Sequence, residues 1–257
     1  MILSSVDEVW AEDTRHSGRL LQQLNVKARL HACHDHNESA QVERLLARLA
    51  EGASIALISD AGTPLISDPG YRLVNACRAN GFAVTPIPGA SALVAALSVS
   101  GLPTDRFAFE GFLPHKAGQR RELIASLQSD PRTLVFYEST HRIVAALSDL
   151  QDGFGADRAA SLARELTKQY ESVVTGTLAD VCDYVAADAN HRRGEFVVMV
   201  SGAAKAPDNQ AEISRVLAIL LPELSVKRAS AATAAITGAP RNRVYQQALA
   251  MSSRADD

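Results

Sequence analysis

Short apolar runs alternate with amphipathic stretches along the chain, and this alternation predicts strands and helices in turn. The run Ile55–Ile58 has the pattern of a buried strand, and after a loop of small residues a helical pattern covers Tyr71–Asn80. Phe82–Ile87 is predicted as a second strand, and the small apolar residues of Ala92–Ser100 as a second helix. This strand–loop–helix order, repeated twice, indicates a parallel sheet with ligand-binding loops at its carboxyl edge.

The residues ahead of these elements extend the same α/β domain, for which we expect the bounds 1–104. Ile2–Trp10 has the pattern of the tail of an amphipathic helix, and a polar run then leads into a helix that ends near Leu24. A strand is predicted over Ala28–Cys33 and an amphipathic helix over Ser39–Ala50.

A second α/β domain is predicted over 105–202, after a linker around Pro103. Five apolar runs in it have strand patterns, and they cover residues 108–113, 133–137, 159–163, 172–177 and 196–201. Charged side chains stand at the ends of two of these strands, where loops can present them to a ligand. They are Glu138 and His141 after the second strand, and Arg164, Glu165 and Lys168 after the third.

The carboxyl-terminal part of the chain predicts a small all-α domain over 211–257, behind a linker of small and polar residues. Helical patterns cover Ala211–Leu221, Val226–Thr237 and Asn242–Met251. The short glycine-containing turn before the last helix and several basic residues resemble a helix-turn-helix, and these residues are Lys227, Arg228, Arg241 and Arg243. A small bundle that mediates self-association is the alternative interpretation.

Composition narrows the class of protein. With 47% hydrophobic and 21% charged residues, the 257-residue chain is expected to be soluble and globular. It has no apolar run long enough to span a membrane and no signal-peptide pattern at its start, and its three cysteines fit a reducing cytoplasm. The net charge of −3 argues against a wholly basic nucleic-acid binder, although a local basic patch remains possible.

Residues with metal-binding chemistry gather after the strand that ends near Cys33, where the sequence reads HDHNE over residues 34–38. Three interpretations stay open for this segment: a metal site, a loop near the active site, and a loop that caps a helix. Alternation along a strand sends neighbouring side chains to opposite faces, so we expect no metal here. The loops after Ile58 and Ile87 match neither GxGxxG nor GxxxxGK[ST], so the usual dinucleotide and P-loop motifs are missing.

Eight motifs together resemble one enzyme family across nearly the whole chain. They read WAEDTRHSG, HDHNE, SDAGTPLISDPG, PGASA, GLPTDRFAFEGFLPHK, FYESTHR, ARELTK and RRGEF. The chain therefore resembles the small-subunit ribosomal RNA cytidine 2′-O-methyltransferases of the tetrapyrrole (corrin/porphyrin) methylase superfamily. The resemblance implies two α/β domains with S-adenosylmethionine between them, a homodimer, a helix-turn-helix-like domain that assists RNA binding, and 16S rRNA of the small subunit as the substrate.

The resemblance also implies where the ligands bind. The cofactor positions that carry over are Asp60, Ala61, Gly62, Thr63 and Pro64 in the first loop, and Pro88, Gly89, Ala90 and Ser91 in the second. We expect RNA contacts from His34, His36, Asn37, Arg164, Lys227, Arg241 and Arg243.

Methylation of a ribose hydroxyl needs alignment with the methyl group and an acceptor for the hydroxyl proton. Our expected catalytic residues are Lys168, Glu165 and Glu138, with Lys168 first because burial or Arg164 would depress its pKa. The alternative is that Arg164, Glu165 and Lys168 form an ion-pair network that only fixes the geometry.

Two other functions remain as alternatives to RNA methylation. A tetrapyrrole C-methyltransferase would leave the basic carboxyl-terminal helices without a role. A ligand-sensing helix-turn-helix regulator would need a strongly basic recognition helix, and residues 242–251 contain only Arg243.

One departure from the family pattern generates a prediction. The resemblance implies a first strand and a Thr-Pro-Ile-Gly-Asn-Leu-like loop that this sequence does not contain. We expect protein made from Met1 to be poorly soluble or inactive, because a missing interior strand exposes unpaired backbone groups of its neighbours. Adding about 30–40 upstream residues should rescue it. Monodispersity, melting and methyl transfer of the two lengths test this, and equal behaviour would contradict it.

Overall fold

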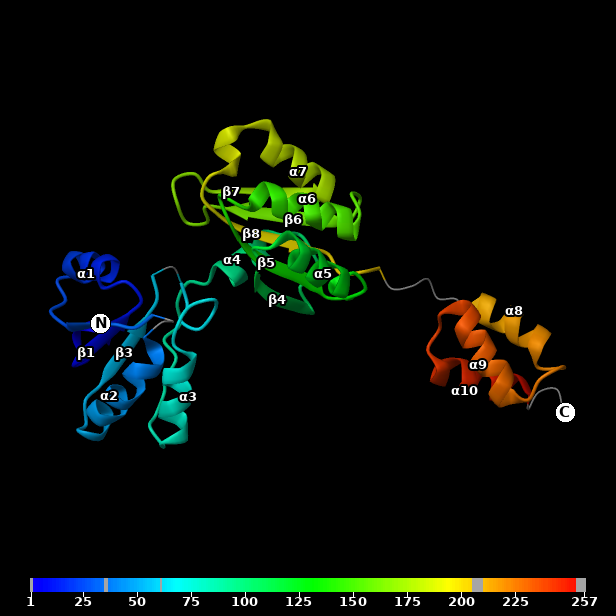
Figure 1. The fold of residues 1–257 in the computed structure, drawn as a ribbon, viewed down its shortest axis with the longest axis horizontal. Coiled ribbons are helices and arrows are strands. Elements are labelled where there is room, and N and C mark those ends of the chain that lie inside the picture. The colour runs from blue at the N-terminus through cyan, green and yellow to red at the C-terminus, as the bar shows by residue number, and fades with distance from the viewer. Residues whose placement is uncertain (1, 35–36, 61, 205–209, 253–257) are drawn as a thin grey trace. The chain divides into compact units, whose positions relative to one another are not determined.

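Two β-sheets lie in the first of two units that make up the chain, residues 1–202, and the second unit, residues 203–257, is built from helices (Figure 1). The computed structural model describes residues 2–34, 37–60, 62–204 and 210–252. Within these residues no helix is long and apolar enough to cross a membrane.

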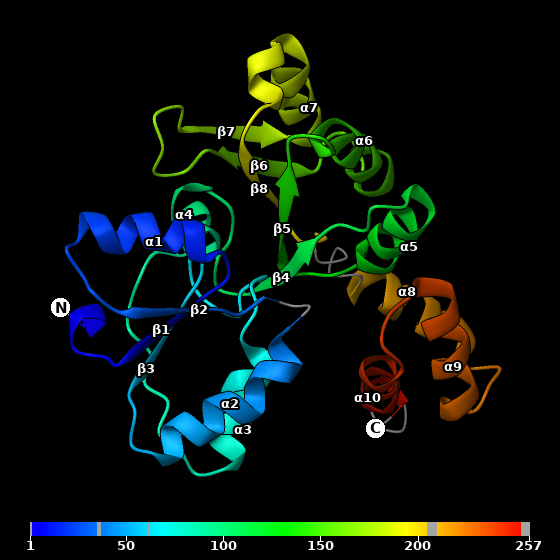
Figure 2. The same ribbon diagram turned by 60° about the vertical axis from the view of Figure 1, so that its left-hand side comes forward.

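The first sheet is parallel and has the order β2-β1-β3. Its central strand β1 (Glu8–Ala11) lies between β2 (Arg29–Ala32) and β3 (Ile55–Ile58). Figure 2 shows α1 (Thr14–Gln23) on one face of this sheet and α2 (Glu38–Ala50) on the other. The predicted strands around residues 28–33 and 55–58 are confirmed, and so is the parallel arrangement.

The prediction that residues 2–10 form the tail of a helix is wrong. Ile2–Ser4 forms a short 3₁₀ turn, η1, and β1 follows it. Val9 packs against Leu21 of α1, whereas Trp10 packs on the opposite face against Leu45 of α2. A strand that is buried on both faces has a continuous apolar pattern without polar alternation, so its sequence does not distinguish it from a buried helix turn.

The predicted strand at residues 82–87 is also wrong. After α3 (Tyr71–Ala79) the chain forms no strand before α4 (Ala92–Val99). Phe82 and Val84 do pack against the core that surrounds Trp10, which explains their apolar pattern. Among the described residues, however, β3 pairs only with β1, and a strand requires a hydrogen-bonded neighbour as well as a buried face.

The second sheet has the order β4-β5-β8-β6-β7 and confirms all five strands predicted after residue 105. These strands are β4 (Phe107–Phe112), β5 (Thr133–Ser139), β6 (Ala159–Arg164), β7 (Ser172–Thr177) and β8 (Glu195–Val200). Strand β4 runs parallel to β5, whereas β8 runs antiparallel to both β5 and β6.

Opposite faces of the second sheet carry different helices. One face packs on α5 (Ala117–Leu127), α6 (Ile143–Phe154) and α7 (Leu178–Ala187), and a short 3₁₀ helix η2 (Ala189–Arg192) follows α7. The other face packs on α4: Leu93, Ala96 and Leu97 contact a cluster formed by Val135, Ala163, Val197 and Met199. Helix α4 follows the first sheet in sequence but contributes to the core of the second, so it joins the two.

The helical unit confirms three helices at the carboxyl end of the chain. They are α8 (Gln210–Leu220), α9 (Val226–Thr237) and α10 (Arg241–Ser252), and they share a core around Ile213, Leu217 and Val244. Gly238 ends α9 with a φ of 68°, a left-handed conformation that glycine adopts without steric cost.

The glutamate of the HDHNE segment caps helix α3, which is one of the three interpretations of that segment. Glu38 is buried, and its Oε1 accepts hydrogen bonds from the backbone N–H groups of Gly70, Arg72 and Leu73 at 3.1, 2.7 and 3.3 Å. The first turn of a helix has N–H groups without intrahelical partners, and a buried carboxylate satisfies them. Glu38 therefore fixes the direction in which the long loop after β3 enters α3.

We predict that Glu38→Ala destabilises the protein by about 1–3 kcal/mol, because it leaves buried N–H groups without acceptors. Each kcal/mol lost corresponds to a fall in melting temperature of about 2–4 °C in a domain of this size class. Calorimetric melting measures the change. Glu43→Ala is the matched control, because Glu43 is exposed on the same helix. Equal melting temperatures for the two variants would contradict the capping role.

Candidate functional site

Two loops contact each other beyond the carboxyl ends of the first sheet, and both were predicted as ligand loops. The Thr63 hydroxyl donates a hydrogen bond to the carbonyl oxygen of Ala90 at 2.9 Å. Asp60, two residues after β3, accepts hydrogen bonds at its Oδ1 from the backbone N–H of Asp13 at 3.4 Å and from the hydroxyl of Ser17 at 3.5 Å. The structure therefore brings the 60–64 loop and the 88–91 loop together; Ala61 lies outside the described residues.

The loop after β3 has a strained backbone. Leu65 and Ser67 have φ values of 73° and 62°, in the left-handed region that side chains other than glycine rarely adopt. Gly70 has a φ of 128°, and a β-carbon there would lie 2.6 Å from Cδ2 of Leu57. Such conformations cost roughly 1–3 kcal/mol each and concentrate at ligand sites.

Tyr137 joins these loops to the second sheet, and the sequence did not point to it. Its phenol oxygen accepts a hydrogen bond from the backbone N–H of Leu93, in the first turn of α4, at 3.0 Å. Its ring packs edge-on against Phe109 and Phe112, with centroid distances of 4.8 and 5.8 Å. Burial, and to a smaller extent the charge of Asp68, raise the pKa of Tyr137, so its hydroxyl stays protonated.

Glu138 follows Tyr137 at the end of β5 and is 2% exposed. Neighbouring residues of a strand point to opposite faces, so Tyr137 lies on the face that packs on α4, and Glu138 lies on the face that packs on α5 and α6. Its Oε1 accepts hydrogen bonds from the backbone N–H of Ser139 at 2.9 Å and pairs with the guanidinium of Arg142 at 2.6 Å. Its Oε2 is buried and has no hydrogen-bond partner within the described part of the chain. Burial raises the pKa of Glu138 despite the opposing effects of Ser139 and Arg142.

A third cluster follows β6 and contains the other two predicted catalytic residues. Nζ of Lys168 lies 3.0 Å from Oε1 of Glu165 and 3.0 Å from Oε2 of Glu195. Burial by itself lowers the pKa of Lys168, but the hydrogen bonds and charges of Glu195 and Glu165 outweigh it and the pKa is raised. The expectation of a depressed pKa is therefore wrong, and the ion-pair alternative describes Lys168 and Glu165.

Within the described residues Arg164 forms no ion pair, although its charge helps to lower the pKa of Glu165. Its guanidinium donates to the backbone carbonyl oxygens of Arg193, Tyr170 and Asn190 at 2.7, 3.1 and 2.9 Å. Arg164 thus ties β6 to the segments on either side of the site. Its predicted RNA contact stays a prediction.

Gly194 of the RRGEF motif leaves room for the side chain of Glu165, which pairs with Lys168. It has a φ of 104°, and a β-carbon at this position would overlap the side chain of Glu165. Its backbone N–H donates to the hydroxyl of Thr140 at 2.9 Å, and that hydroxyl donates to its carbonyl oxygen at 2.8 Å. The ESTHR, ARELTK and RRGEF motifs are thereby joined at one end of the second sheet.

The predicted RNA-contacting residues occupy different environments. His34 and Asn37 form a turn after β2, in which Asn37 accepts from the His34 backbone N–H at 2.9 Å and donates to Ala32 at 3.1 Å; His36 lies outside the described residues. Lys227 and Arg241 line a hollow between α9 and α10. Arg243 instead donates to the side-chain oxygen of Gln210 at 2.9 Å. Where the chain is described, no group of three or more His, Cys, Asp or Glu side chains could hold a metal.

Comparison with known proteins identifies the family. The model of the tetrapyrrole (corrin/porphyrin) methylases matches residues 1–182. The chain belongs to the tetrapyrrole methylase family. A second model, the RsmI C-terminal HTH domain, matches residues 207–252.

Curated relatives and solved structures agree with this family. Proteins named ribosomal RNA small subunit methyltransferase I, from Pseudomonas aeruginosa and Escherichia coli O157:H7, are 52% and 49% identical to this chain. Each match covers 96% of the chain, and 89% and 87% of the two relatives. The solved structure of the methyltransferase CobJ has a TM-score of 0.56 and 19% identity, and the match covers 79% of this chain and 86% of CobJ. Diphthine synthase has a TM-score of 0.59 and 17% identity, and the match covers 77% of this chain and 81% of that structure. These two share the fold, and the predicted tetrapyrrole-methylase-like α/β fold is confirmed.

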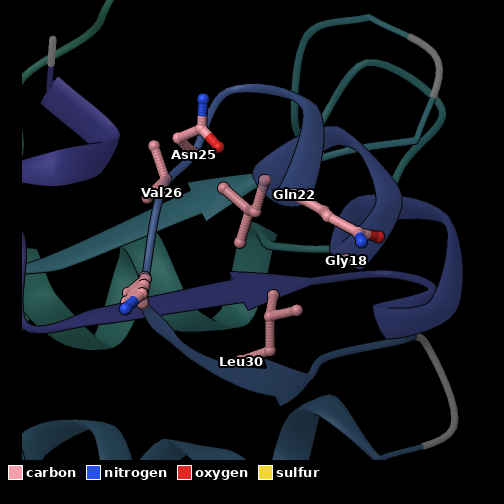
Figure 3. Close-up of a pocket in the computed structure, with 8 residues that line it drawn as sticks. Gly18, Gln22, Asn25, Val26 and Leu30 are labelled. Carbon is pink, nitrogen blue, oxygen red and sulfur yellow. The ribbon is translucent and has the colours of Figure 1, made fainter.

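A separate cavity of about 380 Å³ lies between α1 and β2 (Figure 3). Its lining includes Gln22, Asn25, Val26 and Leu30, where the chain leaves α1 and enters β2. The entry to β2 is at the amino edge of a parallel sheet, whereas the 60–64 loop follows the carboxyl end of β3. The cavity is therefore not part of the candidate site.

We predict that Gly194→Ala destabilises the protein by at least about 1–3 kcal/mol, because alanine is strained at this φ and its methyl group displaces Glu165. Gly118→Ala is the control: Gly118 lies in α5 with nothing within 4 Å of a β-carbon, so alanine there should stabilise by a few tenths to about 1 kcal/mol. Thermal melting of both variants tests this. If Gly194→Ala has the same melting temperature as the wild type, the prediction is wrong, and the Glu165 side chain can move aside at no cost.

Proposed function

We propose that this chain is an S-adenosylmethionine-dependent methyltransferase that methylates the 2′-oxygen of a cytidine ribose in 16S ribosomal RNA of the small subunit. The observation that carries the proposal is the match over 96% of the chain to proteins named ribosomal RNA small subunit methyltransferase I. The match includes the helical unit, which the tetrapyrrole methylase model does not cover. The enzyme acts in the cytoplasm, where small subunits are assembled.

The cofactor would bind at the 60–64 and 88–91 loops. Their residues fit such a ligand, because Gly62, Thr63 and residues 85–90 are exposed and can offer backbone groups to it. A β-carbon at Gly89 would have no atom nearer than the carbonyl oxygen of Ile87 at 3.9 Å, so the space above this glycine is open. When bound, S-adenosylmethionine supplies a methyl group already activated on a sulfonium.

Glu138 is the residue that we assign to the ribose hydroxyl. A general base needs an unoccupied acceptor atom and a pKa nearer to neutrality than that of an ordinary carboxyl. Oε2 of Glu138 has no partner among the described residues, and burial raises the pKa of this side chain. Because this oxygen is buried on the face of β5 opposite α4, the assignment requires the end of β5 to open to the ribose when RNA binds. Transfer would form the O–CH₃ bond and break the S–CH₃ bond of the sulfonium, which leaves a neutral thioether. The hydroxyl proton would pass to Oε2, while Arg142 holds Oε1 in place.

Lys168 and Glu165 take a positioning role in this scheme. A lysine with a raised pKa remains protonated near neutral pH and cannot accept a proton. Oε1 of Glu165 is held by Lys168 and by the backbone N–H of Glu195 at 2.9 Å. These contacts keep the ends of β6 and β8 in register, next to the site.

We also propose that the enzyme works as a homodimer. Helix α4 is apolar except for Ser98, and its outward face leaves Val94 and Val99 61% and 51% exposed. Exposed apolar side chains on a helix whose other face is already buried are typical of a subunit interface. Sedimentation measures the oligomeric state: we expect a dimer for the wild type and a monomer for Val94→Glu. A monomeric wild type would contradict the proposed dimer.

The direct test of the function is transfer of a tritiated methyl group from S-adenosylmethionine to small ribosomal subunits that lack the modification. We expect radioactivity in the 16S RNA, recovered after nuclease digestion as 2′-O-methylcytidine. Radioactivity in a base, or none in RNA together with methylation of a tetrapyrrole, would contradict the proposal.

We predict that Glu138→Gln lowers methyl transfer by roughly 10²–10⁴-fold, the range for loss of a general base, without weakening cofactor binding. Because the pKa of Glu138 is raised, the wild-type rate should fall as the pH drops below that value and the carboxylate becomes protonated. The glutamine variant should lack this fall.

The control is Glu122→Gln, because Glu122 is exposed on α5 and its substitution should leave methyl transfer unchanged.

Lys168→Met should weaken activity less than Glu138→Gln. Near-normal single-turnover rates for Glu138→Gln, with a large loss for Lys168→Met, would reverse the assignment.

A further inference from the structure

A hollow of about 460 Å³ lies between α9 and α10 in the helical unit. Helix α9 contributes Lys227, Ser230 and Ala231, and α10 contributes Arg241, Asn242 and Tyr245. All six residues belong to the amino-terminal halves of their helices. The positive ends of two helix dipoles therefore border one hollow, which favours a negatively charged ligand.

Two arginines near the hollow are engaged by other side chains, whereas, in the part of the chain that the structure describes, the two cations that line it are not. Arg215 is paired with Glu212 at 2.8 Å, and Arg243 donates to Gln210. Lys227 and Arg241 are exposed, and no hydrogen bond or ion pair of their side chains is found within the described residues. None of the residues that line the hollow is acidic, so its positive charge is not neutralised locally.

The other lining residues add surfaces suited to a nucleotide. Tyr245 is 41% exposed and lies one helical turn after Arg241, so the two side chains share a face of α10. An exposed aromatic ring beside a cation can stack a base while the cation holds the phosphate. The amide of Asn242 can both donate to and accept from a base edge.

We propose that this hollow binds one unpaired nucleotide of RNA, with its phosphate between Lys227 and Arg241 and its base on Tyr245. The inference rests on the proposed function and deepens it, because it assigns a defined RNA subsite to the helical unit. The inference gives an RNA-binding role to Lys227 and Arg241 but not to Arg243, which does not line the hollow and contacts Gln210 of α8. It also replaces self-association as the role of this surface.

The test measures binding of a fluorescent single-stranded RNA oligonucleotide to the full chain at several salt concentrations. Lys227→Ala and Arg241→Ala should each weaken binding and reduce the slope of log affinity against log salt by about 0.7, as expected for one lost phosphate contact on a single strand. Tyr245→Ala should weaken binding by roughly 5- to 150-fold with the slope unchanged.

The matched control is Arg228→Ala, which removes the same charge from the same helix turn but not from the lining of the hollow. It should keep wild-type affinity and slope. An equal loss for Arg228→Ala would show a diffuse basic surface and overturn the subsite. A change in sedimentation for Lys227→Ala or Arg241→Ala would show a subunit interface and overturn it as well.

Methyl transfer by the wild type separates this inference from the proposed function. If the wild type binds and methylates RNA while the lining variants bind like it, only the subsite is wrong. If the wild type neither binds RNA nor methylates small subunits, the proposed function fails, and the subsite fails with it.

Discussion

The attachment of α4 to the second sheet is the constraint on which the candidate site depends. Leu93, Ala96 and Leu97 are buried against the second sheet, and the backbone of Leu93 donates to Tyr137. Because the 88–91 loop leads directly into this helix, the loop has a fixed position relative to the ends of β4 and β5. The loop in turn holds Thr63 through the carbonyl of Ala90. Ligand loops from one sheet and charged residues from the other are thus joined through buried contacts.

Two loops, one after β3 and one after β6, have strained backbone, and a buried carboxylate lies at the end of β5 on the sheet face opposite α4. Leu65 and Ser67 in one loop, and Glu165 and Thr167 in another, have positive φ values, and Glu138 keeps a buried oxygen without a partner among the described residues. Each of these features costs free energy in the folded state, and the apolar cores on both faces of the second sheet offset that cost. Strain that is retained in these two loops is consistent with ligand binding by them.

The sequence predicted what depends on local pattern. The five strands of the second sheet and the two loops of small residues follow from apolar runs and turn residues. It failed where a distant partner decides the outcome. Residues 82–87 have a strand pattern but no neighbour within the described chain, and Tyr137 acquires its role from a helix 44 residues earlier. The pKa of Lys168 rises because Glu195, on another strand, faces it, and the sequence around Lys168 contains no sign of that contact.

Calorimetric titration of S-adenosylmethionine into Gly89→Val tests the central claim, that the joined loops form the cofactor site. Gly89 does not have a positive φ, and a β-carbon there meets open space, so valine should leave melting unchanged and obstruct only a ligand. We expect the wild type and a Gly118→Val control to bind and Gly89→Val to lose detectable binding. Unchanged affinity in a Gly89→Val protein that melts like the wild type would contradict the account.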